Sequence, residues 1–237
     1  MSAVPDVEAM AAGLLAAQRA NVPYLAPSRE AALDLAEAYA VQRAFTALRA
    51  RTEPLAGFKA AANAAALQRA LGLAGPVTGV LFASGERAAG SVVQRGDYRS
   101  LMIETEVGFH AARPIDRPVS GVGELQQAVS TCCAVIELAD PGFGGAAIRG
   151  TDLVATNAAT AGFIRGPAHR AQGLPVNALT VCLQRDGDPL HEVRADVLMG
   201  DQWQALLWLV NAVIEQGHVI APGQLLITGA LGGAHTA

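Results

Sequence analysis

The pattern of apolar and polar positions changes character near residue 54. Before it, alanine-rich stretches over residues 3–20 and 28–50 repeat apolar side chains at helical spacing, which predicts two α-helices. Ser28 is suited to cap the second helix. The stretch Asn-Val-Pro-Tyr-Leu-Ala-Pro between them contains two prolines and predicts a loop.

After Pro54 the chain consists of short apolar runs separated by glycine and proline, which is typical of strands. The predicted strands cover residues 55–60, 77–83, 91–95, 100–110, 132–139, 160–165, 177–184, 190–194 and 225–229. The predicted helices cover residues 63–71, 122–130 and 201–216. Asp186-Gly187 is a strong hairpin signal between two of these strands. Because strands outnumber helices and do not alternate regularly with them, the pattern favours a mixed, β-rich α+β fold over a doubly wound sheet.

Composition narrows the possible classes of protein. Hydrophobic residues make up 51% of the 237 residues, enough for a sizeable core in one large domain. The net charge of −4 and the absence of clustered arginines argue against nucleic acid as a partner. The first ten residues lack a basic region, so we expect no signal peptide. The longest uncharged apolar helix candidate, residues 203–214, is too short to cross a membrane.

The chain contains three cysteines, an odd number that does not suggest a disulfide framework. Cys132 and Cys133 are adjacent and have apolar neighbours, and Cys182 alternates with hydrophobic residues in a predicted strand. We therefore expect buried, reduced thiols in a cytoplasmic protein.

Two glutamates, Glu104 and Glu106, stand two residues apart in the predicted strand Leu-Met-Ile-Glu-Thr-Glu-Val-Gly-Phe. Because side chains alternate along a strand, both carboxylates point to the same face. Glu137 lies in another predicted strand, among alanine, valine, isoleucine and leucine, and this strand is expected to be buried on both faces. An unpaired carboxylate in such a strand is costly or has a shifted pKa, so Glu137 needs a partner.

The residues alone leave the nature of that partner open. One of the sixteen arginines could form an ion pair with Glu137, and Glu104 and Glu106 would then face water on an ordinary amphipathic strand. If the three carboxylates converge instead, they form an all-oxygen site suited to a hard divalent cation such as Mg²⁺ or Mn²⁺.

Lys59 is the only lysine in the chain and stands in the apolar stretch Leu-Ala-Gly-Phe-Lys-Ala-Ala-Ala-Asn. A GC-rich coding bias would explain the preference for arginine. A chemical role would explain the exception, because lysine is a compact point charge that can lose its proton when desolvated.

Other catalytic and binding motifs are missing or incomplete. Gly-Phe-Gly-Gly-Ala-Ala, residues 142–147, loosely matches a dinucleotide-binding turn, but no acidic residue follows between Asp152 and Asp186 to hold a ribose. There is no nucleophile elbow and no P-loop. The five histidines lack the spacing of a zinc site.

The order of several short motifs resembles one known family. These are Gly-Phe-Lys, Leu-Phe-Ala, Ile-Glu-x-Glu-Val, the lone glutamate of Val-Ile-Glu-Leu, Asn-Ala-Ala-x-Ala-Gly and Ile-Thr-Gly-Ala-Leu. From about residue 30 to the end, the chain is similar to the 2-keto-4-pentenoate hydratase and 4-oxalocrotonate decarboxylase group of the fumarylacetoacetate hydrolase superfamily. The resemblance implies a mixed β-sheet roll, with an N-terminal helical region over residues 1–54 and a β-rich catalytic domain over residues 55–237.

The resemblance also implies a site. Glu104, Glu106 and Glu137 would ligate Mg²⁺ or Mn²⁺, and Lys59 would face the substrate as the catalytic residue. Four further residues correspond to positions near the substrate: Asn157, Thr160, Thr228 and Ser84. Members of the family form homo-oligomers, so a homo-oligomer is expected.

The implied activity is that of a metal-dependent lyase in the catabolism of aromatic compounds. Its substrate would be a short 2-oxo or 2-hydroxydienoic acid, and its reaction a hydration or a decarboxylation. A metal acting as a Lewis acid would stabilise the enolate in either case. Lys59 would stabilise negative charge or move a proton, as a desolvated amine with a pKa near neutrality.

Two other functions remain open. One is a C–C bond hydrolase of the same superfamily, for which no clear Glu–His pair is found near the N-terminal region. The other is a non-catalytic homologue acting as a binding or assembly subunit. Two features support this third interpretation. Ser84 and Thr156 stand where the family usually has acidic residues, and the chain ends at Ala237, which implies that the last strands are missing.

Overall fold

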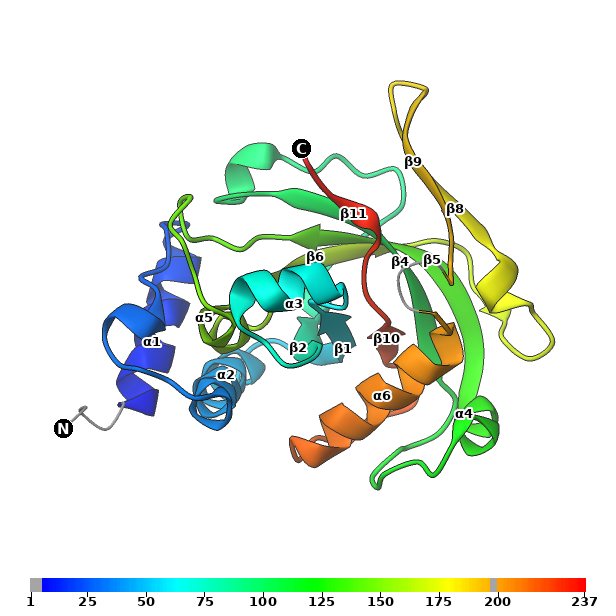
Figure 1. The fold of residues 1–237 in the computed structure, drawn as a ribbon, viewed down its shortest axis with the longest axis horizontal. Helices are drawn as coiled ribbons and strands as arrows, with labels where there is room; N and C mark the ends of the chain where they lie inside the picture. The colour runs from blue at the N-terminus through cyan, green and yellow to red at the C-terminus, as the bar shows by residue number, and fades with distance from the viewer. Residues whose placement is uncertain (1–5, 197–199) are drawn as a thin grey trace.

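Helices and strands of the described chain follow the sequence pattern closely (Figure 1). The computed structural model describes residues 6–196 and 200–237. Its helices are α1 (Val7–Arg19), α2 (Leu35–Ala50), α3 (Ala65–Leu71), α4 (Val122–Ala128), α5 (Gly150–Ala155) and α6 (Gln202–Glu215). Its strands are β1 (Leu55–Ala61), β2 (Val77–Phe82), β3 (Glu86–Arg87), β4 (Met102–Ala111), β5 (Val129–Ala139), β6 (Thr160–Arg165), β7 (His169–Arg170), β8 (Thr180–Arg185), β9 (Asp188–Arg194), β10 (Leu225–Ile227) and β11 (Leu231–Thr236).

Nine strands of the described residues form one mixed sheet in the order β2-β1-β10-β4-β5-β6-β3, with β11 also beside β4 and β7 beside β5. β1 pairs with β10 in parallel, whereas β4 and β5 form the long antiparallel centre. The sheet curls until its two sides meet, since a Cβ atom added to Gly79 of β2 would lie 2.8 Å from Thr160 Oγ1 of β6. The predicted α+β class with a mixed β-sheet roll is confirmed.

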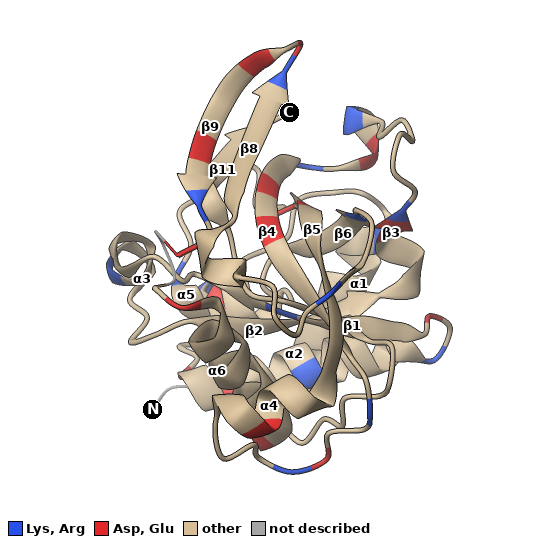
Figure 2. Cartoon of the chain, turned by 90° about the vertical axis from the view of Figure 1, so that its right-hand side faces the viewer, with Lys and Arg blue, Asp and Glu red and all other residues tan. Residues whose placement is uncertain are grey.

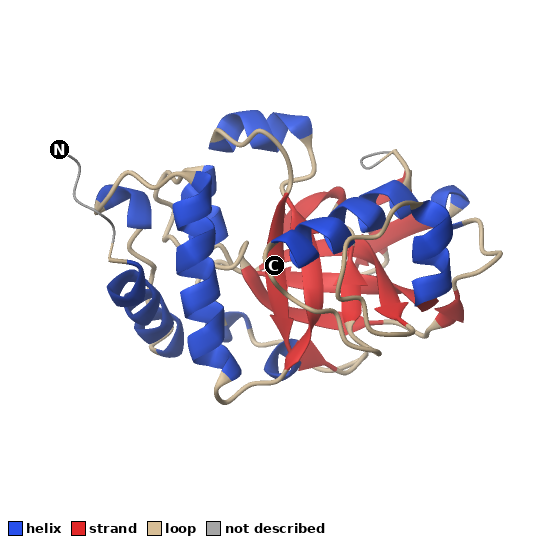
Figure 3. Ribbon diagram, turned by 90° about the horizontal axis from the view of Figure 1, so that it is seen from below, coloured by secondary structure: helices blue, strands red, loops and turns tan. Residues whose placement is uncertain are grey.

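The main core lies between the outer face of this roll and α6 (Figure 3). Phe58 and Phe109 of the sheet are fully buried there with Leu206 and Leu209 of the helix. Such side chains contribute about 1.5–3 kcal/mol each by leaving water. The core therefore fixes β1 and β4, two of the strands that carry the predicted site residues.

A second apolar cluster fills one end of the interior of the roll. Leu81, Val135, Phe163, Leu225 and Ile227 meet there, each at most 2% exposed. We call these five residues the floor of the roll. On β5, Val135 of the floor stands two residues before Glu137 on the same face, and on β10, Ile227 of the floor pairs with Lys59. The polar residues of the interior therefore begin at the edge of the floor.

The start of the second helix differs from the prediction. α2 begins after Asp34, not at Ser28, because Asp34 and Glu37 cap each other's backbone N–H groups in a complete capping box. Ser28 lies in a 3₁₀ turn and donates its hydroxyl to buried Asp152 at 2.8 Å.

Other differences concern elements after β2. The predicted strand 91–95 does not form, whereas α5 and the strands β3, β7 and β11 were not predicted. β11 pairs with β4, so the segment after Ile-Thr-Gly-Ala-Leu adds a strand to the sheet. The boundary predicted at residue 54 stays a prediction.

The hairpin at Asp186-Gly187 is confirmed as β8–β9, which projects from the roll (Figure 2). This projection leaves Cys182 exposed, so its predicted place in the core is wrong. Cys132 and Cys133 are buried and unbridged, as expected. No helix of the described residues is long and apolar enough to cross a bilayer.

Gly57 permits the closest approach of β1 to β10. Its φ is +154°, and a Cβ atom there would lie 1.8 Å from the carbonyl oxygen of Leu225. We expect Gly57→Ala to destabilise the fold by roughly 2 kcal/mol or more, measured by denaturant unfolding. Gly13→Ala in α1, where a Cβ meets nothing within 4 Å, is the matched control and should stabilise by about 0.5–1 kcal/mol. Equal effects of the two substitutions would contradict the close approach.

Candidate metal and substrate site

The pairing of β4 with β5 brings the three predicted carboxylates together. Glu104 lies directly opposite Glu137, and Glu106 stands two residues further along the same face of β4. One carboxylate oxygen from each residue lies within 4.8 Å of the other two. Like charges directly opposite on neighbouring strands repel each other, so the arrangement requires a compensating positive charge.

Lys59 supplies part of this compensation from β1. Its Nζ atom lies 2.5 Å from Oε1 of Glu137, and both side chains are almost completely buried. β10 and β4 separate β1 from β5 in the sheet, so the curl of the roll makes this contact possible. Glu137 therefore has the buried partner that the sequence requires, and this partner is the lysine instead of an arginine.

One ammonium group does not balance three carboxylates. Burial, followed by the charge of Glu137, raises the pKa of Glu104 to about 7. The same two causes raise the pKa of Glu106 well above its usual range. Burial alone would lower the pKa of Lys59, but the three carboxylates outweigh it, and the pKa is raised. Without a bound cation, the three carboxylates therefore oppose the near-neutral pKa that the sequence analysis expects for the Lys59 amine.

The buried carboxylates also have unused bonding capacity. Glu106 Oε2 accepts a hydrogen bond of 2.6 Å from the N–H of Gly229. Within the described chain, Glu106 Oε1 and Glu137 Oε2 are buried and have no hydrogen-bond partner. Buried acceptors without partners are costly. Excess negative charge and free carboxylate oxygens are what a hard divalent cation satisfies, so these three residues fit such an ion.

Asn63 belongs to the same site, although the sequence did not single it out. Its Nδ2 donates to the Thr228 carbonyl at 2.7 Å, while its Oδ1 is buried without a partner among the described residues. Gly229, with a φ of +114°, makes room for it, since a Cβ there would lie 1.4 Å from Asn63 Nδ2. Asn63 is the first residue of the predicted helix 63–71 and lies just before α3 in the structure, so no local pattern marks it as a site residue.

Two of the other predicted site residues support the backbone. Both amide atoms of Asn157 bond to the backbone of Val80, and the Thr228 hydroxyl bonds to Gln202 and to the Val107 carbonyl. Asn157 also begins three consecutive residues with φ near +60°, a left-handed turn that costs roughly 1–2 kcal/mol per residue. Their side chains thus hold β2 and α6 in place beside the site.

Thr160 and Ser84 lie in different surroundings. The Thr160 hydroxyl is buried without a partner among the described residues and faces Gly79 inside the roll. Ser84 follows the far end of β2, which pairs with Leu55, and its hydroxyl bonds to Glu53. The structure does not bring Ser84 to the carboxylates. Thr156, which replaces a usual aspartate, bonds to the Asp152 carbonyl within α5.

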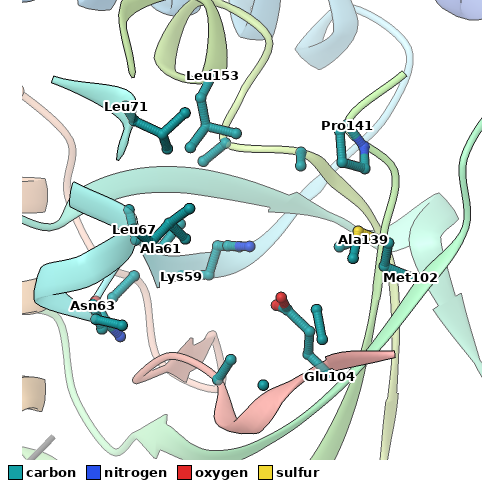
Figure 4. Close-up of a pocket in the computed structure, with 18 of the residues that line it drawn as sticks. Lys59, Ala61, Asn63, Leu67, Leu71, Met102, Glu104, Ala139, Pro141 and Leu153 are labelled. Atoms are coloured by element: carbon teal, nitrogen blue, oxygen red, sulfur yellow. The ribbon is translucent and has the colours of Figure 1, made fainter. Parts of the chain in front are cut away.

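A pocket of about 340 Å³ opens beside the carboxylates (Figure 4). Lys59, Asn63 and Glu104 contribute polar atoms to its lining. Most of the remaining wall is apolar. It comes from the end of β1 and the segment after it, from α3, from α5 and the turn after it, from the ends of β4 and β5, and from β11. This volume lies at the lower end of the range for small-molecule sites, about 300–1,000 Å³. The site therefore combines a polar, charged end with an apolar cavity.

Comparisons with known proteins show which sequences and folds this chain is similar to. No family model matches the chain. The 2-keto-4-pentenoate hydratase of Paraburkholderia phymatum is 30% identical over 230 residues, which cover 95% of this chain and 87% of that protein. The 4-oxalocrotonate decarboxylase of a Pseudomonas species (strain CF600) is 24% identical over 84% of this chain and 76% of its own length.

A solved structure shares the fold. The 4-oxalocrotonate decarboxylase of Pseudomonas putida G7, complexed with magnesium and adipate, superimposes with a TM-score of 0.90. The match covers 98% of this chain and 89% of that chain at 22% identity. The 30% identity to the hydratase, over 95% of this chain, leads to one conclusion: the chain belongs to the 2-keto-4-pentenoate hydratase and 4-oxalocrotonate decarboxylase family.

Proposed function

We propose that this chain is a divalent-metal-dependent lyase that acts on a short 2-oxo or 2-hydroxydienoic acid. The observation that carries the proposal is the convergence of Glu104, Glu106 and Glu137 at the end of a pocket, with one lysine as counter-charge and two buried oxygens without partners. An arrangement this costly needs a compensating ligand. The same convergence of carboxylates argues against a non-catalytic homologue, because a protein that binds no metal would gain nothing from three buried carboxylates.

The three glutamates would hold Mg²⁺ or Mn²⁺. When bound, the cation would supply Lewis-acid chemistry, polarising the oxygens of a 2-oxo acid. The chain's own residues would orient the substrate around it. Asn63 Oδ1 is free to accept a hydrogen bond from a substrate hydroxyl, and the fixed Thr228 carbonyl prevents its amide from turning.

Lys59 would be the catalytic cation. It is the only basic side chain in the pocket lining of the described residues. Its ammonium group can stabilise negative charge that develops on the substrate, in a cavity where little water screens it. An ammonium also carries a proton that can be delivered to a substrate carbon or oxygen, which both addition of water and loss of carbon dioxide require. The apolar walls would limit competing proton exchange with solvent.

Hydration is the favoured reaction of the two. The hydratase relative is more similar in sequence than the decarboxylase relative, at 30% against 24% identity. Product analysis decides between them, because addition of water gives a hydrated keto acid and releases nothing, whereas decarboxylation of a substrate with a second carboxylate releases carbon dioxide. The homo-oligomeric state and the cytoplasmic location stay predictions.

Calorimetric titration of Mn²⁺ tests the proposal directly. We expect saturable binding that becomes at least tenfold tighter in the presence of pyruvate, because a 2-oxo acid chelates the cation and adds ligands to it. Glu86→Gln, a change at an exposed carboxylate that pairs with Arg165 outside the pocket, should bind Mn²⁺ like the wild type. Absence of saturable binding would refute the metal site.

A further inference from the structure

The charged side chains of the pocket lie at one end of it, and this distribution limits which substrates the proposed enzyme can bind. Among the described residues that line it, Lys59 and Glu104 are the only charged side chains, and both belong to the carboxylate end. Figure 4 shows Leu71 and Leu153 on the side of Lys59 away from Glu104. A substrate whose acid head is held at the carboxylate end would extend its other end toward this side.

The distal wall is built from aliphatic side chains. Leu67 and Leu71 of α3 lie four residues apart and so share one helix face, and Ile148 and Leu153 face the same cavity. We call these four residues the aliphatic wall. The cavity of about 340 Å³ has room for a group beyond a three-carbon 2-oxo acid head.

The nearby arginines are turned away or already engaged. Arg69 lies between Leu67 and Leu71 in sequence but is exposed on another face of α3, and Arg149 is exposed next to Ile148. The buried guanidinium of Arg99 bonds to Asp140 at 2.9 Å and lies over the Tyr24 ring, and its Nη1 atom has no hydrogen-bond partner among the described residues. None of the three lines the pocket. All seventeen basic residues of the chain lie in its described part, so none outside it can reach the wall.

From this wall we infer that the substrate carries a single carboxylate and an apolar tail, and that the site discriminates against a second carboxylate at the distal end. This inference rests on the proposed function. A terminal carboxylate placed against the aliphatic wall would lose part of its hydration without gaining a cation or a side-chain hydrogen-bond donor from the wall. An alkyl tail would gain roughly fourfold in affinity for each methylene that leaves water.

Binding of stable 2-oxo acids to the Mn²⁺-loaded protein, followed by calorimetry, tests the inference without turnover. The matched pair is 2-oxooctanoate and 2-oxooctanedioate, which have equal chain length and differ at the distal terminus. We expect 2-oxooctanoate to bind at least tenfold more tightly than both pyruvate and the diacid. A diacid that binds as tightly as the monoacid overturns the inference and leaves the lyase standing. Failure of all three acids, pyruvate included, overturns both.

A charge introduced into the wall should reverse the preference. Leu67 is 47% exposed, so Leu67→Arg is compatible with folding and places a cation at the pocket. We expect at least fivefold tighter binding of 2-oxooctanedioate and weaker binding of 2-oxooctanoate. Ala70→Arg, on the same helix but outside the lining, should leave both affinities unchanged. Equal effects of the two variants would show a general charge effect and overturn the role of the wall.

Discussion

A Glu137→Gln variant is expected to bind Mn²⁺ at least about 100-fold more weakly than the wild type and to lose turnover of a 2-hydroxydienoic acid. The substitution preserves shape but removes the carboxylate that pairs with Lys59 and carries one of the two oxygens without partners. Changes to residues that only support metal ligands cost about 10–100-fold in affinity, so loss of a direct ligand should cost at least the upper value. Calorimetry gives the affinity, and loss of the dienol absorbance gives the rate.

Folding must be separated from ligation in this experiment. Breaking a buried ion pair can cost about 3–5 kcal/mol, although Glu104 and Glu106 remain near Lys59 to compensate its charge. Glu104→Gln, at a less buried ligand, should show the same loss of metal affinity with a smaller effect on thermal unfolding. If folded Glu137→Gln bound Mn²⁺ as tightly as the wild type, the assignment of the ligands would be wrong.

Lys59→Met is expected to lower turnover and to raise the affinity for Mn²⁺, whereas Glu137→Gln should lower both. Turnover should fall by about 10²–10⁴-fold, because the only cation in the described pocket lining is removed. Mn²⁺ affinity should rise, because the ammonium group no longer competes with the metal for Glu137 Oε1, 2.5 Å away. Steady-state kinetics and calorimetry on the same preparation measure the two effects.

Lys59→Arg is the informative companion variant. The planar guanidinium is larger than the ammonium and always charged, so it should keep metal affinity low without restoring the rate. A purely structural role for Lys59 predicts that metal binding and turnover fall together in Lys59→Met. That joint loss is the result that would exclude Lys59 as the catalytic cation.

Much of the site could be predicted from local patterns. The two-residue period of a strand places Glu104 and Glu106 on one face, and the apolar neighbours of Glu137 indicate its burial. Lys59 stands out because it is the only lysine. The convergence of these four side chains depends on the curl of the sheet, which no local pattern specifies.

Most errors and omissions of the sequence analysis have one physical cause, which is that contacts between distant segments are not visible in local patterns. Asn63 and Gly229 matter through a contact between segments 166 residues apart, and Gly229 looks like any turn glycine until its neighbour is known. Asn157 and Thr228 were expected to face the substrate, but motif matches do not say where a side chain points, and both bond to backbone instead. The start of α2 was readable from Asp34 and Glu37, whose capping box is a stronger signal than Ser28.

The apolar floor of the roll has a consequence for kinetics. Phe163 and Leu225 close that end of the interior almost completely, so cation and substrate share the mouth next to α3 and β11 among the described residues. Of the three glutamates only Glu104 lines the pocket, so a cation held by all three would lie deeper than an acid head bound in the pocket. Entry through one mouth would then impose a compulsory order, in which the metal associates first and leaves last. Such an enzyme would keep its metal over many catalytic cycles, and excess substrate would slow metal exchange.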